Sequence, residues 1–196
     1  MPAERTYAAT VNDVISRVRE VINDKEIAYR NGDNEILLWI NDAINSVLVN
    51  IPALFAKIGQ HACSQGVLQE VRLSRAHLVL DIIGVPVADI AALSRFMPGW
   101  SSMAAGPIQN WAAIPNSPLA FYCYPPSSDA QIIPILYAES PAPITSIAAV
   151  IPLPETYVPA LVDYCVGMCE SKDDESVNSN RASQFMADFV ARVRGT

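Results

Sequence analysis

The residues best suited to covalent catalysis in this chain are a histidine and a cysteine, His61 and Cys63, two positions apart. In an extended segment they point to the same side, where an imidazole could take the proton of a thiol. A working nucleophile also needs a third group to orient the base, and the nearby sequence supplies none. We therefore interpret the pair as chance neighbours and expect no catalytic residue, although an enzyme that uses them is one of three hypotheses.

Two further groups could bind metal ions. Asp173, Asp174 and Glu175 are consecutive carboxylates, whereas a calcium loop needs spaced ligands and a glycine at its bend. Cys165 and Cys169 lie four apart on a predicted helix, but a zinc site needs two more ligands in a chain with only 2 histidines. We expect no metal and no cofactor. The cysteines are interpreted as packing residues of a protein in a reducing compartment, the cytoplasm.

Nucleic-acid binding is not favoured by the charges. The net charge is −7, and the 13 basic residues are scattered, with the densest group at Arg192 and Arg194. Tight binding of DNA phosphates needs clustered Lys and Arg side chains. An acidic surface, in contrast, allows DNA to move past without being bound. A base-stacking platform would also need interleaved basic residues. The aromatic residues of the middle segment are therefore expected in a sheet core or a subunit interface: Trp100, Trp111, Tyr122, Tyr124 and Tyr137.

The chain is apolar for a protein outside the membrane. Of its 196 residues, 51% are hydrophobic and 17% charged. It has no run of about 18 apolar residues, so no membrane span is predicted, and no signal peptide is visible. A single domain of this size has limited interior, so we expect partner subunits to cover part of the apolar surface.

Both ends of the chain have helical periodicity. Thr10 and Asp13 form a capping-box pattern before an apolar stripe that ends at Ile22. Asp33 is predicted to cap a second helix that ends before Pro52, and the short loop favours an antiparallel pair. Two helices are also expected after residue 153. They are joined at an acidic turn, residues 172–175, and pack against each other.

The middle of the chain is predicted to form β-strands. Between Gln60 and Pro154 lie 12 of the 15 prolines, which exclude long helices there. One short helix is predicted at 89–96, and a turn at 125–129. Strands are predicted at 68–73, 77–83, 108–114, 119–124 and 131–138. The predicted fold class is α+β: a helical bundle of residues 1–60 and 153–196, with an antiparallel β insertion domain at 61–152.

Several short patterns, in this order, resemble the head-to-tail adaptor (connector) proteins of tailed bacteriophages. An N-terminal helix carries Leu-Leu-Trp-Ile-Asn-Asp-Ala-Ile and ends at a proline. Four elements follow: Gln-Gly-x-x-Gln, Leu-x-x-x-x-Pro-x-Trp, a Pro-x-x-Phe-x-x-Tyr-Pro-Pro strand, and a strand that ends in Tyr-Ala before a proline. The chain closes with an Ile-Pro-Leu-Pro-Glu-x-Tyr helix start, a Lys-Asp-x-Glu turn and an Arg-Ala-x-x-Phe-x-x-x-Phe helix. Their positions are residues 37–44 with Pro52, 65–69, 93–100, 118–126, 137–141, 151–157, 172–175 and 181–189.

This resemblance implies a structural virion protein. Such adaptors form a ring, most often of twelve copies, that docks below the portal protein and continues its DNA channel to the tail or nozzle protein. The expected place is the virion neck, with DNA passing unbound and no membrane partner. The alternative is a non-enzymatic protein-binding module that uses a sheet edge or a helical groove.

Two sets of residues are candidates for contacts. The exposed, positively charged end of the chain is predicted to touch the portal: Arg192, Val193 and Arg194. Large aromatic side chains are predicted in the core or in subunit interfaces: Trp39, Trp100, Trp111, Tyr164, Phe185 and Phe189.

Overall fold

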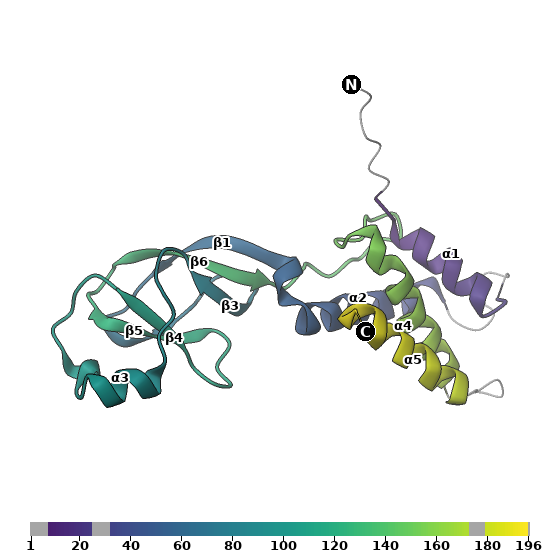
Figure 1. Cartoon of the computed structure of the whole chain (residues 1–196). Helices are drawn as coiled ribbons and strands as arrows, with labels where there is room; N and C mark the ends of the chain where they lie inside the picture. Colours follow the sequence, from purple (N-terminus) through teal and green to yellow (C-terminus); the bar gives the residue numbers. More distant parts are fainter. Residues whose placement is uncertain (1–7, 25–31, 173–178, 196) are drawn as a thin grey trace, which may run out of the picture. The chain divides into compact units, whose positions relative to one another are not determined.

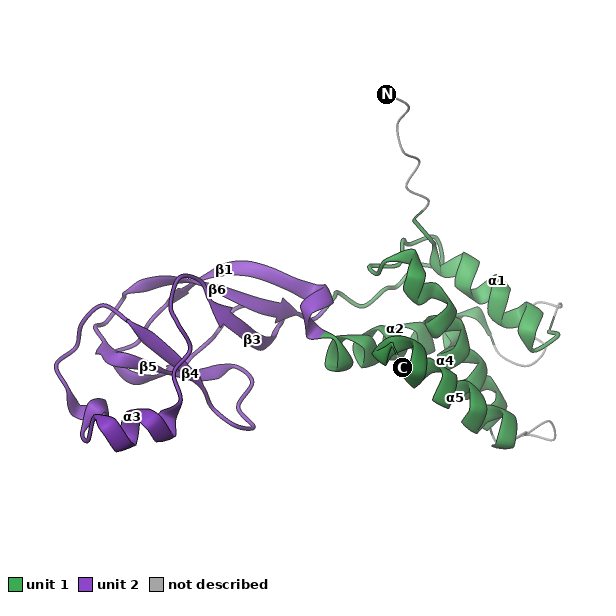
Figure 2. Cartoon of the chain, in the orientation of Figure 1, with its two compact units in different colours: residues 1–51, 141–196 green, residues 52–140 purple. Residues whose placement is uncertain are grey.

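The structure, a computed structural model, describes residues 8–24, 32–172 and 179–195. Its chain divides into two compact units (Figure 2). Unit 1 consists of Met1–Ile51 and Pro141–Thr196, and unit 2 is Pro52–Ser140. The described residues form five α-helices and two three-stranded antiparallel sheets (Figure 1), so the predicted α+β class is confirmed. The compact units meet at 51/52 and 140/141, whereas the expected domain boundaries were 60/61 and 152/153.

Unit 1 is a helical bundle built around one helix. Its helices are α1 (Val11–Val21), α2 (Asp33–Asn50), α4 (Val158–Ser171) and α5 (Ser179–Arg194). α4 packs against all three others and most extensively against α5, as predicted for the C-terminal pair. Its side chains are therefore buried on nearly every side, including Leu161, Cys165 and Cys169, which are fully enclosed. A helix enclosed by neighbours needs this apolar character all round.

The helix starts of unit 1 follow local chemistry. Thr10 caps α1: its hydroxyl accepts from the Asp13 N–H at 3.3 Å, while its own N–H donates to the Asp13 carboxylate at 2.8 Å. This is the predicted capping box. The predicted cap of α2 was wrong by one residue, because Gly32 is the N-cap and Asp33 is already helical. The Asp33 carboxylate instead accepts from Arg19 at 2.6 Å, so it is not free to cap.

The two halves of unit 1 are joined by main-chain pairing. The segment before α4 lies against the start of α1, with Val11 N–H donating to Ala149 O and Ile151 N–H donating to Ala9 O, each at 2.9 Å. The Asn41 side chain of α2 holds the same returning segment through two bonds to the Ile144 main chain, at 2.8 and 3.0 Å. Residues more than 100 positions apart therefore close one bundle.

Unit 2 contains the two sheets. The first has the order β1-β6-β3 and the second β2-β5-β4. The strand bounds are β1 Ala56–Ala62, β2 Gly66–Glu70, β3 Ala76–Ile82, β4 Asn110–Ala113, β5 Ala120–Ser127 and β6 Ile132–Glu139. A single core includes Ile82, Phe121 and Ile135, each with no exposed surface. Apolar side chains on one face of each sheet thus enclose this core.

Two elements of unit 2 differ from the prediction. Strand β1 was not predicted, because most of its side chains are exposed and its polar residues do not alternate with apolar ones. The predicted turn at 125–129 begins too early, since β5 continues through Pro125 and Pro126 to Ser127 and the turn lies at 129–130. The pairing of β2 with β5 is irregular between Gly66 and Leu68, opposite these prolines, so no regular ladder donor is lost there.

The predicted short helix at 89–96 is α3 (Ile90–Phe96), and Asp89 caps it by accepting from the Ala91 N–H at 2.8 Å. The 3-10 turns are η1 (Pro52–Phe55), η2 (Trp100–Ser102) and η3 (Glu155–Tyr157). The Gln-Gly-x-x-Gln element is a structural clip. The Gln69 side chain, fully buried, accepts from Ser64 N–H at 2.8 Å and donates to the carbonyls of Ser64 and Gly66 at 2.9 and 3.0 Å. Gly66 has φ of +111°, which strongly favours glycine.

Candidate assembly surfaces

His61 and Cys63 both lie on the inner side of unit 2. Cys63 is 2% exposed in the core cluster, and burial raises the pKa of its thiol, which keeps it protonated. His61 is 6% exposed and packs edge-on against Phe121 at 5.7 Å between ring centroids. Burial lowers the pKa of His61, and the nearby Gln69 side chain partly opposes this shift. A protonated thiol beside a neutral imidazole gives no support to a thiolate nucleophile.

The lowered pKa of His61 has a consequence for stability. A histidine whose folded pKa lies below its unfolded value, roughly 6.5, must be neutral to remain buried. The unfolded chain then binds more protons, so stability is lost as pH falls through the unfolded value towards the folded one. We expect the unfolding free energy of unit 2 to fall more between pH 7 and pH 5 in the natural protein than in His61→Gln. Equal pH dependence of the two denaturant-unfolding profiles would contradict the assignment.

The tryptophans of unit 2 are buried rather than arranged as a stacking platform. Trp100, in η2, is 9% exposed, contacts the Tyr122 ring at 5.9 Å and donates its indole N–H to Ser94 Oγ at 3.3 Å. Trp111, in β4, is 5% exposed and lies 6.2 Å from the Phe121 ring. Their faces are occupied by neighbouring side chains within unit 2, which leaves them unavailable to bases.

The aromatic candidates of unit 1 lie in and beside the bundle core. Trp39 of α2 is 9% exposed, and Phe189 of α5 is 5% exposed. Tyr164 of α4 is half-buried and meets the Phe189 ring edge-on at 5.1 Å. Phe185 is half-buried under the Arg181 guanidinium, 5.6 Å from its ring. Tyr164 and Phe189 therefore hold α4 and α5 together.

The three C-terminal candidates have different environments. Arg192 donates to the Asp163 carboxylate of α4 at 2.6 Å, and Val193 is 3% exposed. Burial raises the pKa of Asp163, and Arg192 opposes that rise. Arg194 is exposed and donates to the Asn50 side chain at 3.3 Å. Val193 thus anchors α5 inward, while Arg194 presents its charge at the surface.

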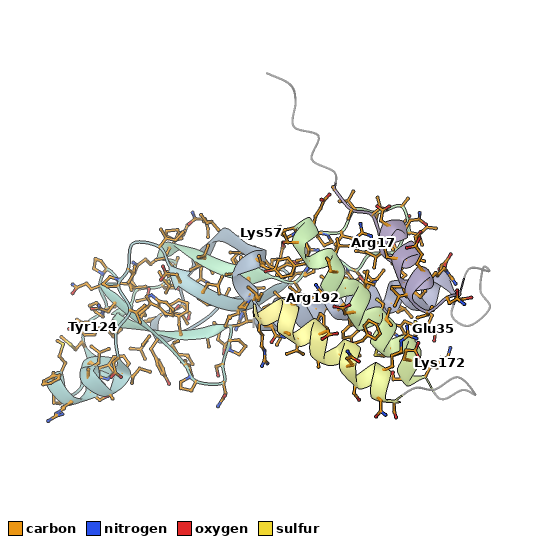
Figure 3. The ribbon with its side chains drawn as sticks, turned by 45° about the vertical axis from the view of Figure 1, so that its right-hand side comes forward. Arg17, Glu35, Lys57, Tyr124, Lys172 and Arg192 are labelled. Atoms are coloured by element: carbon orange, nitrogen blue, oxygen red, sulfur yellow. The ribbon has the colours of Figure 1, made fainter. Side chains whose placement is uncertain are left out.

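The end of α4 is fastened to α2 by an ion pair. Lys172 Nζ lies 3.0 Å from a carboxylate oxygen of Glu35, and the two side chains approach each other in Figure 3.

Asp173, Asp174 and Glu175, considered as a possible cation site, lie outside the described residues. Within the described ranges, no group of three or more His, Cys, Asp or Glu side chains is placed to hold a metal ion. The helices described also include none long and apolar enough to cross a membrane.

Unit 2 exposes apolar side chains on the outside of its first sheet. Ile58 of β1 is 68% exposed and pairs across from Leu136, and Ile132 of β6 is 66% exposed and pairs across from Ala62. Paired residues of an antiparallel ladder point to the same face, so the large side chains Ile58, Ile132 and Leu136 share what we call the outer β1–β6 face. A second exposed group lies at and after α3, where Phe96 is 75% exposed and Met103 47%. Exposed apolar patches of this kind mark interaction surfaces.

Comparison with known protein families gives the class of this molecule. A family model described as SU10 adaptor protein matches residues 9–195, which include both compact units. The chain belongs to the SU10 adaptor protein family. No curated protein matches it in a sequence comparison. The adaptor family is one of phage head-to-tail proteins, so this adaptor has a structural role at the neck of a virion, as the resemblance implied.

Sequence reasoning missed the outer surface of this adaptor. The outer β1–β6 face depends on β1, which has no clear apolar alternation, and on its register with a strand about 75 residues away. Phe96 was assigned to a short helix without any role. Its position in the sequence could have indicated exposure. Phe96 directly precedes Met97-Pro98-Gly99, so it stands at the end of a short helix rather than in the middle of a buried face.

Proposed function

We propose that this adaptor assembles with copies of itself into a closed ring of twelve, docks below the portal protein and continues the DNA channel towards the tail or nozzle protein. The observation that supports this most is the family match, which covers both the bundle and the β unit. A cyclic ring needs two different complementary surfaces on each copy. The outer β1–β6 face supplies an apolar surface suited to such a contact.

The net charge of the protein suits a channel through which DNA passes. A net charge of −7 disfavours a tight grip on DNA phosphates, so DNA would pass without specific binding. The basic C-terminal end of α5 is the proposed portal contact, made by Arg192 and Arg194 while Val193 holds the helix in place. This assignment rests on surface charge, which steers association between protein partners.

Arg194 is the residue that tests the portal contact most cleanly. Truncating the C-terminus would remove buried Val193 and the Asp163–Arg192 pair, and so would confuse binding with stability. Arg194→Glu reverses an exposed charge, so we expect portal binding to weaken by about tenfold, or 1.4 kcal/mol. The unfolding free energy should change by less than about 1 kcal/mol, because the substitution loses a surface hydrogen bond and a favourable charge at the end of a helix. Binding is measured by co-sedimentation of the purified protein with isolated portal rings.

The matched control is Arg17→Glu, the same charge change at an exposed residue of α1. We expect it to leave portal binding within about twofold of the natural protein, since it lies outside the proposed contact. Equal binding by the natural protein and Arg194→Glu would contradict the C-terminal contact. Failure of the natural protein itself to bind portal rings, alone or after mixing with tail proteins, would contradict the proposed neck position.

A further inference from the structure

Two of the four outermost strands of unit 2 are covered along their outer edge. The Val79 N–H of β3 donates outward to Pro118 O at 2.8 Å. On β4, the Trp111 N–H donates to Pro86 O at 3.1 Å, and the Trp111 carbonyl accepts from Ala88 N–H at 2.7 Å. Proteins cover edge strands in this way because unpaired N–H and C=O groups invite another strand.

The edges of β1 and β2 are open. Cys63 bonds towards β6, donating to Gln131 O at 2.8 Å and accepting from Ala130 N–H at 3.0 Å. Main-chain groups alternate along an antiparallel strand, so those of Gln60 and Ala62 point away from β6. In the described part of the chain, β6 is the only strand paired with β1, and β5 the only one paired with β2. The N–H groups of Gln60 and Ala62 therefore face no partner strand.

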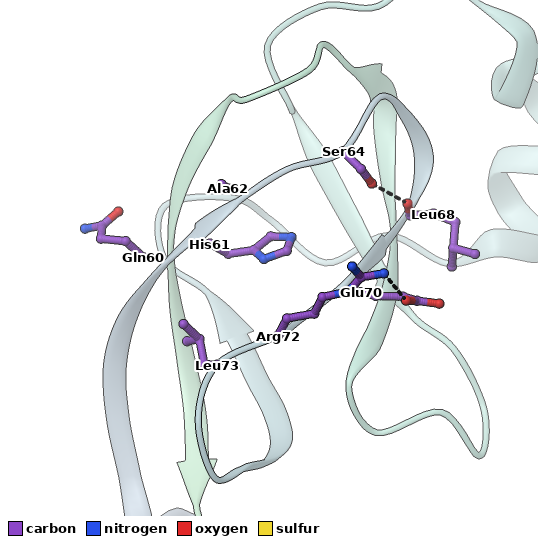
Figure 4. A pocket seen from close by; sticks show the side chains of 8 residues that line it. All are labelled: Gln60, His61, Ala62, Ser64, Leu68, Glu70, Arg72 and Leu73. Atoms are coloured by element: carbon purple, nitrogen blue, oxygen red, sulfur yellow. Dashed lines mark hydrogen bonds and ion pairs between the residues drawn. The ribbon is translucent and has the colours of Figure 1, made fainter.

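The open edges border one cleft of about 530 Å³. Gln60 and Ala62 line it from β1, and Leu68 and Glu70 line it from β2. Figure 4 shows the two strands diverging from the turn at Ser64, with the cleft between them. A segment in this cleft would therefore run beside the strand edges rather than across a sheet face.

His61 supplies a second, independent observation. Its side chain is 6% exposed, and its Nε2 atom has no hydrogen-bond partner in the described structure. The imidazole extends from β1 into the space between the strands (Figure 4) and lines the cleft. Buried polar atoms are nearly always hydrogen-bonded. An unpartnered Nε2 that lines an open cleft offers a hydrogen-bonding position to a segment that binds there.

The charge and polarity of the residues that line the cleft indicate what kind of segment it can bind. Glu70 and Arg72, both exposed at its rim, form an ion pair at 3.2 Å, so the rim presents no net charge to a partner. Gln60, Ala62 and Leu68 add uncharged polar and apolar surface. This matches an extended, uncharged segment better than a charged one. Among the described strands, the outer edges of β3 and β4 are already occupied. The β1 edges of two copies would pair about a two-fold axis, which a cyclic ring does not contain, and this favours a different polypeptide.

We propose that this cleft binds an extended, uncharged segment of another virion protein, which adds as a strand to the open edge of β1 and hydrogen-bonds to His61. Main-chain bonds supply the affinity in this mode of recognition, and the side-chain contacts supply the specificity. The inference rests on the proposed function, because the neck of the virion provides the partner.

Amide hydrogen exchange resolved to single residues tests it, on the purified full-length protein and on assembled virions. In the free protein, we expect the Gln60 and Ala62 amides to exchange fast and those of Gly59 and His61 slowly, since the latter face β6. In virions, exchange at Gln60 and Ala62 should slow by about tenfold or more. Unchanged exchange at both amides, in virions that contain the protein, would overturn the proposal. Slowing already present in the purified protein would overturn it in favour of a second copy as occupant.

A pair of variants at one position provides the genetic test. Ala62→Pro removes the outward N–H and fixes φ at this position, which an extended edge strand tolerates. Ala62→Ser keeps that N–H. We expect Ala62→Pro to lower phage titre by about tenfold or more, while Ala62→Ser stays within about twofold. Both variants should bind portal rings normally and unfold at a similar denaturant concentration.

The outcomes separate this inference from the proposed function. Equal titres for properly folded Ala62→Pro and Ala62→Ser would overturn the strand addition and leave the adaptor role intact. Absence of the natural protein from the neck would overturn the adaptor role, and the strand addition with it.

Discussion

Replacing Phe121 with alanine is expected to destabilise unit 2 by about 3–5 kcal/mol. Phe121 has no exposed surface, and its ring contacts His61 and Trp111 edge-on, at 5.7 and 6.2 Å between centroids. Its removal leaves a cavity where the two sheets share one core. Such a loss is a large fraction of the stability of a small domain.

Guanidinium titration followed by tryptophan fluorescence measures this loss in a Trp39→Phe background, where the remaining Trp100 and Trp111 both belong to unit 2. Phe96→Ala is the matched control: it is the same substitution in the same unit, at a side chain 75% exposed. It should cost less than about 0.5 kcal/mol. Similar losses for the two variants would mean that Phe121 does not occupy the core.

Trp39→Ala is the second large effect, in unit 1. Trp39 is 9% exposed on α2, which packs against α4, and its loss should cost about 3–5 kcal/mol. Because the chain has 3 tryptophans, those left in this variant report on unit 2 alone. The unfolding of unit 1 is therefore followed by helical circular dichroism.

Leu38→Ala is the control for Trp39, since the neighbouring leucine is 64% exposed. We expect a change below about 0.5 kcal/mol for it, apart from the small helix propensity difference. A loss under about 1 kcal/mol for Trp39→Ala would show that the apolar stripe of α2 has been assigned to the wrong face.

Much of unit 1 was predictable because its signals are local. The Thr10–Asp13 capping box depends on residues within one helical turn. The cap of α2 was misassigned for the opposite reason. The Asp33 carboxylate is engaged by Arg19, which lies 14 positions earlier, and pairings of that kind are not visible in the sequence of one segment.

Unit 2 was less predictable because its strands depend on partners distant in the chain. β1 acquires its identity from register with β6, and its own side chains are mostly exposed. Continuation of β5 through Pro125 depends on an irregular pairing with β2. Strand propensity describes a residue on a half-buried pleated surface, so it fails where the strand is an exposed edge.

The candidate contact residues also divide into those that local sequence could place and those that only tertiary packing places. Apolar size placed Trp100, Trp111 and Phe189 in a core or a subunit interface, and the structure buries each of them within its own unit. Position in the sequence did not separate Val193, which is buried, from Arg194 beside it, which is exposed. Only the packing of α5 on α4 decides which of these side chains is available to a partner.

Cryo-electron microscopy of the virion neck tests the central claim most directly. We expect a closed ring of this chain between the portal and the tail, with both compact units fitted in each copy and the channel continuing through the ring. Well-resolved neck density that contains no copy of this chain, or copies found elsewhere in the virion, would contradict the claim.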